Sequence, residues 1–348
     1  DAIIAAGGLD GAVKALIANP KDESIRAAAQ QFVRMVSTPP IISSKIGTLQ
    51  AVQRRIAAGD KSRVQEIPAL AMTIGTLATV KQNVDLLVAQ GGFEVMKSTF
   101  IEVCSVEKFP QQASVLATLM NAMQELMRND RENHSHEYDL SILDGALQAM
   151  SKYGKSAEVA TQALKTIALI ASIPANQAAC LDKGVLEATS VLIGKHGDNV
   201  EVLEAAELVL STLCPGGAQA AELATRQVVP NIFSALNGLA EEGNKEAIPV
   251  VKGFLRLIAD SASTPATKNL VASVPGATDV ITALMDAYDD EGVQDACINC
   301  LESFIREEDV LPIVKKLRLV SEEVVAGSNE RKMERIKAIT EKLGLFLL

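Results

Sequence analysis

The chain has 348 residues, more than the roughly 250–300 that one hydrophobic core usually supports, so it holds either two domains or a repeat array that grows along one axis. Hydrophobic residues make up 48% of the chain, but aromatic residues only 3%, and tryptophan is absent; this favours closely stacked helices over a sheet. The net charge of −10 works against nucleic-acid binding, in which phosphate contacts dominate affinity, so we expect no nucleic-acid partner.

A short apolar pattern recurs along the whole chain. An anchor residue is followed by apolar or small residues at positions +1, +4, +5 and +8, which form one stripe of an α-helix. The clearest self-match pairs LDGAVKAL at 9–16 with LDGALQAM at 143–150, and five of the eight residues are identical. The pattern predicts about eight repeats, each with a helix that starts near its anchor. The anchors are Gly8, Thr48, Gly92, Ile142, Gly184, Val228, Gly276 and Asp309.

A second, longer amphipathic segment follows most of these anchor helices after a turn-prone stretch. Segments rich in proline or glycine punctuate the chain at 37–40, 173–176, 214–217 and 263–266, and we interpret them as loops. No segment alternates with period two for long enough to suggest a sheet, so the sequence predicts an all-α fold. The long helices are expected at 23–36, 64–78, 111–127, 157–171, 200–214, 245–259 and 292–305.

The glycine-apolar starts AAGGLDGAV and AQGGFEVM, and long alanine-rich segments ending in patterns such as AELVLSTLC, resemble armadillo repeats over essentially the whole chain. The resemblance implies a right-handed α-solenoid of about eight armadillo-like repeats, forming one domain over residues 1–348. In such repeats a short helix, a second helix and a long third helix stack, and the third helices line a concave groove. A single unit cannot bury its apolar stripe alone, so stacking creates one continuous core and an extended surface.

We expect a non-enzymatic scaffold or adaptor that binds a partner protein along this groove. The resemblance includes cytoskeletal, axonemal and myosin-related assemblies among the uses of the superfamily. Lys252 and Arg256 are four residues apart and share a helical face, and with Lys165 they would suit acidic groups of a partner. Arg256 is the first choice, because arginine is enriched at interface hot spots; ordinary solvated residues would give the same pattern. The groove candidates are Arg34, Glu125, Lys165, Thr212, Lys252, Arg256 and Ser303.

A nuclear-transport-like cargo receptor is an alternative within the same superfamily. The resemblance implies, for such receptors, an asparagine near the end of each long helix that grips a peptide backbone, and a tryptophan array for basic side chains. This chain has no tryptophan, and none of the residues aligned at the helix ends is asparagine. These residues are Met35, Thr76, Glu125, Leu169, Thr212, Leu257 and Ser303.

A second alternative, from another class, is a metal-binding protein or enzyme. The segment RNDRENHSHEY at 128–138 contains His134, His136 and Glu137, whose imidazole and carboxylate groups are metal ligands in many proteins. The segment lies in the longest interval between anchors, within a polar run, and a solvated loop insertion accounts for it. We therefore expect no metal, no cofactor and no catalytic residue.

The chain has five cysteines, an odd number, and all but Cys297 and Cys300 are far apart in the sequence. They do not form a disulfide framework and indicate a reducing compartment, so we expect a cytoplasmic or cytoskeleton-associated protein. Cys297 and Cys300 lie inside a long helix and are expected to be buried, not redox-active. The isolated His196 is expected to be solvated. The uncharged run 67–80 is too short to span a bilayer, so we expect no membrane span in the chain. The identity of the partner and the oligomeric state are open at this point.

Overall fold

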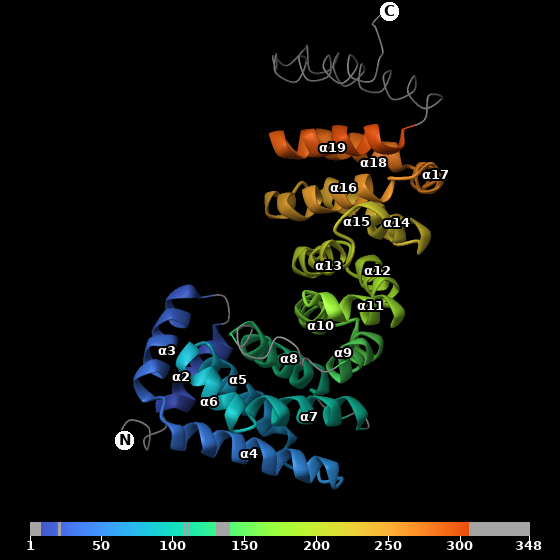
Figure 1. Cartoon of the computed structure of the whole chain (residues 1–348). Coiled ribbons are helices and arrows are strands. Elements are labelled where there is room, and N and C mark those ends of the chain that lie inside the picture. The colour runs from blue at the N-terminus through green and yellow to red at the C-terminus, as the bar shows by residue number, and fades with distance from the viewer. Residues whose placement is uncertain (1–7, 20–21, 107–108, 110, 130–139, 306–348) are drawn as a thin grey trace, which may run out of the picture. The chain divides into compact units, whose positions relative to one another are not determined.

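The chain is built from helices, and a computed structural model describes residues 8–19, 22–106, 109, 111–129 and 140–305 (Figure 1). Two compact units, residues 1–188 and 189–348, are described separately below. The described residues contain no strand, which confirms the all-α prediction. No single helix among them is long and apolar enough to cross a membrane, and only α17 and α18, bent by 71° at their junction, reach that length and apolarity as a pair.

Unit 1 contains the helices up to α11 and the first residues of α12. They are α2 (Gly8–Ala18), α3 (Glu23–Val36), α4 (Pro39–Ala57), the 3₁₀ helix η1 (Val64–Glu66), α5 (Ile67–Ala78), α6 (Lys81–Ala89), α7 (Gly92–Ser105), α8 (Gln112–Asn129), α9 (Leu140–Tyr153), α10 (Ala157–Ala171), α11 (Pro174–Asp182) and α12 (Val185–Lys195).

Unit 2 contains the remaining described helices. They are α13 (Val200–Leu213), α14 (Gly217–Thr225), α15 (Val229–Glu242), the 3₁₀ helix η2 (Lys245–Ala247), α16 (Ile248–Ser261), α17 (Pro265–Ala272), α18 (Ala277–Ala287) and α19 (Glu291–Phe304). All seven long segments expected from the sequence are helical. Two of them, at α5 and α16, open with a 3₁₀ turn before the α-helix.

Each proline- and glycine-rich segment begins with a short non-helical connection, at 37–38, 173, 214–216 and 263–264, and then starts a helix, so the loop interpretation is confirmed only for these first residues. Pro39, Pro174 and Pro265 each begin a helix, and Gly217 begins α14. Proline is well placed there, because its fixed φ suits the first helical turn and its missing N–H would have no partner. The predicted helix start near the anchor Thr48 was wrong, because the helix that contains this residue, α4, already starts at Pro39.

Within each unit, like helices contact like helices in the next triplet. In unit 2 the long helices contact each other in the order α13, α16, α19, the second helices α15 and α18 pack together, and so do the short helices α14 and α17 (Figure 1). In unit 1 the long helices α5, α8 and α10 form a similar series, as do α4, α7 and α9. These contacts fit a helical repeat, in which each triplet buries its apolar stripe against its neighbours.

An asparagine joins a long helix to the following short helix at two places in unit 1. The side-chain amide of Asn83 donates to the carbonyl of Leu77 at 3.0 Å, and that of Asn176 donates to the carbonyl of Ile170 at 3.2 Å. Both acceptors lie six residues back, in the last turn of a long helix, where backbone carbonyls lack helical partners. The same cap in α5–α6 and α10–α11 shows that these two segments share local geometry.

A buried glutamine makes the corresponding link between a second helix and a long helix, once in each unit. The amide of Gln112 donates to the carbonyl of Val103 at 2.6 Å, and that of Gln294 donates to the carbonyl of Met285 at 2.6 Å. Both acceptors lie nine residues back, and a second carbonyl six residues back accepts in each case. These bonds cap the ends of α7 and α18.

The connection from a short helix to the following second helix ends, in four triplets, with a residue whose backbone is in the left-handed conformation, with positive φ. Three of these residues are glycines, Gly91, Gly184 and Gly276, with φ values of +73°, +76° and +72°. The fourth is Gln227, with φ +58°. A residue with a β-carbon is strained in this region by about 1 kcal/mol or more, and glycine is not.

We therefore expect Gln227→Gly to raise the free energy of unfolding of unit 2 by about 0.5 kcal/mol, because the relieved strain exceeds the extra entropy of glycine in the unfolded chain. Gln227 is exposed, so little packing is lost. The reverse change, Gly184→Gln, is expected to cost about 1 kcal/mol. Urea unfolding followed by circular dichroism measures both, and effects of the same sign would contradict the shared turn.

Candidate functional site: the long-helix strip of unit 2

Three long helices of unit 2, α13, α16 and α19, have the same length of 14 residues, so their positions can be compared directly. Their fifth, ninth and thirteenth residues are exposed or half-buried, while the residues between them carry the core. We call these residues the long-helix strip. It consists of Glu204, Leu208 and Thr212 of α13, Lys252, Arg256 and Asp260 of α16, and Asp295, Asn299 and Ser303 of α19.

This register corrects the alignment of helix ends made from the sequence. Thr212 and Ser303 correspond to Asp260, whereas Leu257 is 1% exposed and corresponds to the equally buried Val209 and Cys300. The sequence alignment set Leu257 beside Thr212 and Ser303 because it matched apparent helix ends without the helix starts. Asn299 is the strip's one asparagine, and it lies at the register of Arg256.

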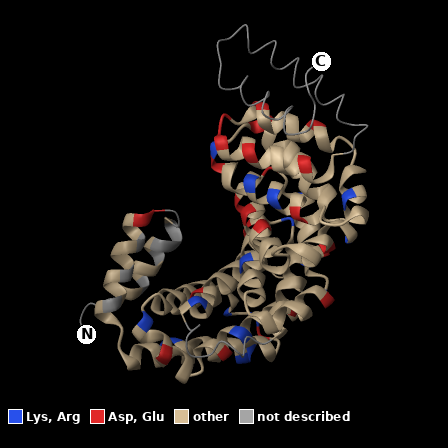
Figure 2. Ribbon diagram, turned by 45° about the horizontal axis from the view of Figure 1, so that its top comes forward, with Lys and Arg blue, Asp and Glu red and all other residues tan. Residues whose placement is uncertain are grey.

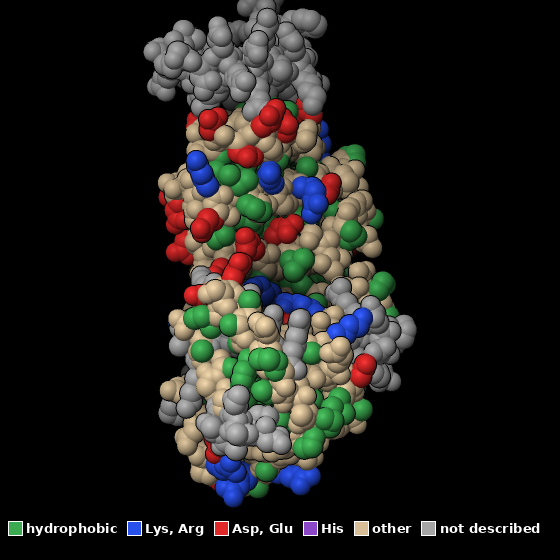
Figure 3. All heavy atoms as spheres, turned by 90° about the vertical axis from the view of Figure 1, so that its left-hand side faces the viewer, with side chains coloured by type: hydrophobic (Ala, Val, Ile, Leu, Met, Phe, Trp, Pro, Cys, Tyr) green, Lys and Arg blue, Asp and Glu red, His purple; other side chains and the backbone are tan. Residues whose placement is uncertain are grey.

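Charges of both signs alternate across the strip. Lysine, arginine, aspartate and glutamate positions are interspersed along the ribbon of unit 2 (Figure 2), and acidic, basic and hydrophobic side chains are mixed on the face of unit 2 that Figure 3 shows. At the fifth position the order from α13 to α19 is Glu204, Lys252, Asp295, and at the thirteenth position Asp260 is the charged residue. The strip is therefore not the basic surface that Lys252 and Arg256 alone suggest.

Arg256 has an acidic partner on the neighbouring long helix. Its Nη2 atom lies 3.4 Å from Oε1 of Glu207, whose side chain is 20% exposed. Burial raises the pKa of Glu207, and Arg256 opposes this rise. A β-carbon at Gly253 would lie 2.7 Å from Glu207 Oε1, so the glycine leaves room for the glutamate side chain to lie across α16. The arginine is 62% exposed, and one 3.4 Å contact leaves most of its five donors available.

Lys252 reaches in the other direction, toward the start of α19. Its Nζ atom lies 3.9 Å from Oδ1 of Asp290, which also caps α19 by accepting from the backbone N–H of Val293 at 2.9 Å. A β-carbon at Gly292 would lie 3.1 Å from this ammonium group. Both predicted cations of α16 are thus partly neutralised by acids of adjacent helices.

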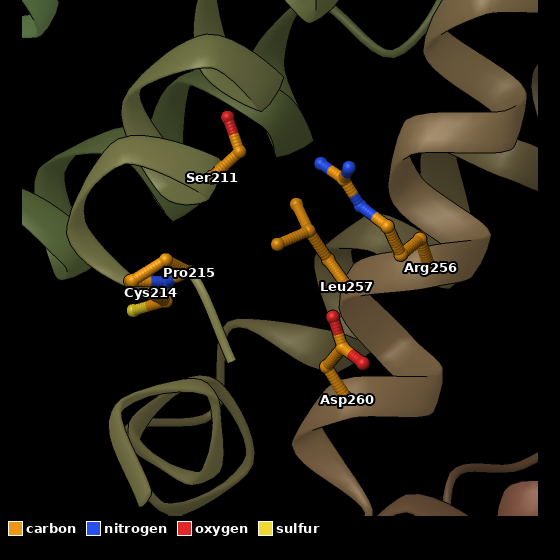
Figure 4. A pocket seen from close by; sticks show the side chains of 6 residues that line it. All are labelled: Ser211, Cys214, Pro215, Arg256, Leu257 and Asp260. Atoms are coloured by element: carbon orange, nitrogen blue, oxygen red, sulfur yellow. The ribbon is translucent and has the colours of Figure 1, made fainter. Parts of the chain in front are cut away.

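An open pocket of about 280 Å³ lies between the end of α13, the segment that follows it, and α16. Arg256 and Asp260 extend from successive turns of α16 at its border, and the side chain of Leu257 lies between them (Figure 4). Ser211, Cys214 and Pro215 line the opposite side. The pocket therefore has a cation and a carboxylate one helical turn apart on α16, and the exposed Pro215 on the opposite side. The sequence signal for Asp260 is its position four residues after Arg256.

Of the unit 1 candidates, Glu125 lies in a separate polar network that joins α8 to α10. Glu125 Oε1 lies 2.8 Å from Nη1 of Arg128, and Nη2 of that arginine donates to Gln124 Oε1 at 3.1 Å. The amide of Gln124 in turn donates to the backbone carbonyl of Gln162 and to the hydroxyl of Thr166, at 3.0 and 3.1 Å. Glu125 is thereby tied into helix packing, and Lys165 is half-buried on α10.

Several predicted residues lie outside the described part of the chain. These are the side chain of Arg34, the whole of His134, His136 and Glu137, and the last anchor, Asp309. Within the described residues, no three histidine, cysteine, aspartate or glutamate side chains are arranged to share a metal ion. Thr212 and Ser303 are half-buried, and their hydroxyls donate to the backbone carbonyls of Leu208 and Cys300 at 2.6 and 2.7 Å.

His196 is buried, with 8% exposure, and the expectation that it is solvated was wrong. The turn that contains it packs against α15. A β-carbon at Gly194 would lie 3.4 Å from the side chain of Asn231, and one at Gly197 would lie 3.7 Å from the Cα atom of Ala235. The two glycines that suggested an exposed turn instead allow a close approach between backbones.

All five cysteines are buried and free, including Cys297 and Cys300. Burial raises the pKa of Cys104, Cys214 and Cys297 to about 12 and that of Cys180 to about 11, and it raises the pKa of Cys300 as well. Thiolate is the reactive form, so the native protein at pH 8 is expected to react with Ellman's reagent only through unfolding. Five thiols should appear in urea, and rapid reaction of any of them in buffer would contradict this burial.

No family model matches the chain, and no curated protein matches it. Among solved structures, the chain is similar to an engineered protein whose crystal structure comes from the Northeast Structural Genomics Consortium, with 16% sequence identity and a TM-score of 0.46. The match covers 94% of this chain and 86% of that chain. Similarity of this degree supports no inference about the fold or the function of this chain.

Proposed function

We propose that the protein is a non-enzymatic, armadillo-like scaffold that binds a protein partner along its long helices. The observation that carries the proposal is the long-helix strip of unit 2. Its three helices contact one another in series, bury one face, and present a continuous row of polar, charged and apolar side chains on the other. Stacked repeats use such surfaces for extended contacts with other proteins.

The triplet order of short, second and long helix supports the armadillo resemblance drawn from the sequence, as do the repeated asparagine and glutamine caps. The partner surface that we propose includes Lys252 and Arg256, whose exposed donors suit carboxylate and carbonyl oxygens of the partner. Leu208 is 48% exposed on the neighbouring helix and adds an apolar contact beside Arg256 in register. The location proposed is cytoplasmic or cytoskeleton-associated. A nuclear-transport role has no such support, because the asparagine series and the tryptophan array are missing from the sequence.

Charge reversal of the strip tests this proposal. A partner is first identified by capture on the purified chain and mass spectrometry, and its affinity is then measured with purified protein. Lys252→Glu with Arg256→Glu is expected to weaken this affinity about tenfold, because two favourable contacts become repulsive. Thermal melting confirms that the variant remains folded.

The matched control is Lys195→Glu with Lys268→Glu, which changes the net charge equally but lies on α12 and α17, outside the strip. It is expected to retain the affinity of the original protein. Equal affinities for the two folded double variants would refute the assignment of the partner site to the strip.

A further inference from the structure

Glu207 is a half-buried carboxylate that lies in a space left for it by a glycine. It is on α13, and its side chain is 20% exposed. A β-carbon at Gly253 of α16 would lie 2.7 Å from its Cγ, Cδ and Oε1 atoms, so any other residue at this position displaces the carboxylate. Glycine inside a helix is unfavourable relative to alanine. The contact with Glu207 accounts for a glycine at this place in α16.

The position of Glu207 determines where one donor of Arg256 lies. The Nη2 atom donates to Oε1 at 3.4 Å, and Glu207 is the one hydrogen-bond partner of Arg256 among the described residues. A solvated arginine samples many rotamers, and ordering it on binding costs affinity. Because Glu207 accepts from only one of the five N–H donors, the contact orders the guanidinium and leaves the other donors to a partner.

We propose that Glu207 is a positioning residue for Arg256, that Gly253 admits it, and that protonation of Glu207 releases the arginine. This inference rests on the proposed function, and it gives the strip a form of regulation. The orientation of the cation at the centre of the strip depends on the charge of a carboxylate on the neighbouring helix. Acidic conditions are therefore expected to weaken partner binding at Arg256.

The surroundings of Glu207 place this release in mildly acidic solution. Burial raises the pKa of Glu207 above the usual glutamate value of 4.5, and Arg256 opposes the rise. Within unit 2, α16 is the principal helix packed against α13, and its other strip charges, Lys252 and Asp260, lie four residues before and after Arg256. On α13, Glu204 lies three residues before Glu207. Glu207 thus becomes neutral at a higher pH than an exposed glutamate, and its ion pair is lost there.

The test follows the guanidinium of Arg256 by NMR in the full chain. Its Nε–Hε signal is assigned by its loss in Arg256→Lys, and circular dichroism confirms that the helices persist at each pH. The signal is expected to shift with a midpoint above pH 4.5, and its heteronuclear NOE should fall as Glu207 is protonated. Glu207→Gln should abolish this transition. Glu204→Gln and Asp260→Asn, which remove neighbouring carboxylates, should keep it.

Gly253→Ala tests the geometry. The added β-carbon displaces the end of a flexible side chain and alanine favours a helix, so the variant is expected to fold. The Arg256 signal should lose its pH-dependent shift and have a low NOE at neutral pH, and partner affinity should fall about threefold through the lost order of one side chain. Gly238→Ala is the matched control and should change none of these, because a β-carbon there meets only the carbonyl of Gly197, at 3.5 Å.

Three results would overturn the inference. The first is an Arg256 signal that does not titrate, or that titrates unchanged in Glu207→Gln. The second is loss of the transition in Glu204→Gln or Asp260→Asn, which would assign it to another carboxylate. The third is a Gly253→Ala variant whose NOE at Arg256 is unchanged, or whose partner affinity is unchanged or raised.

The proposed function fails separately from this inference. If Lys252→Glu with Arg256→Glu releases the native partner while the Arg256 signal is insensitive to Glu207, the strip is the partner site but Glu207 does not position the arginine. If the Arg256 signal follows Glu207 and the charge reversal releases no partner, the contact between the helices is present but the scaffold assignment fails.

Discussion

Gly75→Val is expected to lower the free energy of unfolding of unit 1 by about 3 kcal/mol, at the upper end of the usual cost of overpacking. Gly75 lies in α5, where it meets α8 at close range. A β-carbon at this position would lie 2.9 Å from both the Cα and the Cβ atoms of Ala122. The Cα atom belongs to the backbone, so no side-chain rotation relieves the clash, and the two helices have to separate.

Gly47→Val is the matched control, because Gly47 also lies inside a helix of unit 1, and a β-carbon there would meet nothing within 4 Å. Its effect is expected to stay within about 0.5 kcal/mol. Urea unfolding gives the free energies, and hydrogen exchange should locate the loss of protection in α5 and α8. A cost for Gly75→Val no larger than that of Gly47→Val would show that the two helices pack less closely than described.

Gln112→Leu is expected to destabilise unit 1 by about 2–4 kcal/mol, because it leaves several buried polar groups without partners. The side chain of Gln112 is 2% exposed. Its amide donates to the carbonyl of Val103 at 2.6 Å, and its oxygen accepts from the hydroxyl of Tyr153 at the same distance. Leucine has a similar volume but supplies neither a donor nor an acceptor.

Two further variants define the cause of this loss. Gln82→Leu makes the same chemical change at an exposed position of α6 and is expected to cost less than about 0.5 kcal/mol. Tyr153→Phe removes one partner of Gln112, so the effects of Gln112→Leu and Tyr153→Phe should be less than additive when combined. Full additivity in the double variant would mean that the hydroxyl and the amide do not act together. Gln294→Leu tests the equivalent cap in unit 2, and a loss of similar size is expected.

The sequence by itself determined the all-α fold and the positions of the long helices. A stripe of apolar residues with helical spacing reports burial on one face, and it located segments such as 200–214 within a residue of α13. Composition added that the cores are thin, since aromatic side chains are few. Local patterns carry this information, because the spacing of apolar residues within one helix is enough to indicate its periodicity and its buried face.

Helix starts were harder to predict, because proline and glycine are common both in loops and at the first residues of helices. Pro39 and Pro265 interrupt one element and also begin the next, and the sequence pattern alone favoured loops. Only the tertiary structure shows that a short helix, which buries little surface by itself, is held in place by its neighbours. The contacts of α17 with α14, α16 and α19 are of this kind.

The candidate site depended most on the tertiary structure. The sequence placed Lys252 and Arg256 on one face of a helix, which α16 confirms, but it contained no information on which charges the adjacent helices bring beside them. Glu207 is 49 residues from Arg256 in the chain, and the two meet only because α13 packs against α16 and Gly253 leaves space between them. Spacing within a helix fixes which residues share a face; the sign of the charge that the face presents is decided by packing between helices, which brings together residues that are remote in sequence.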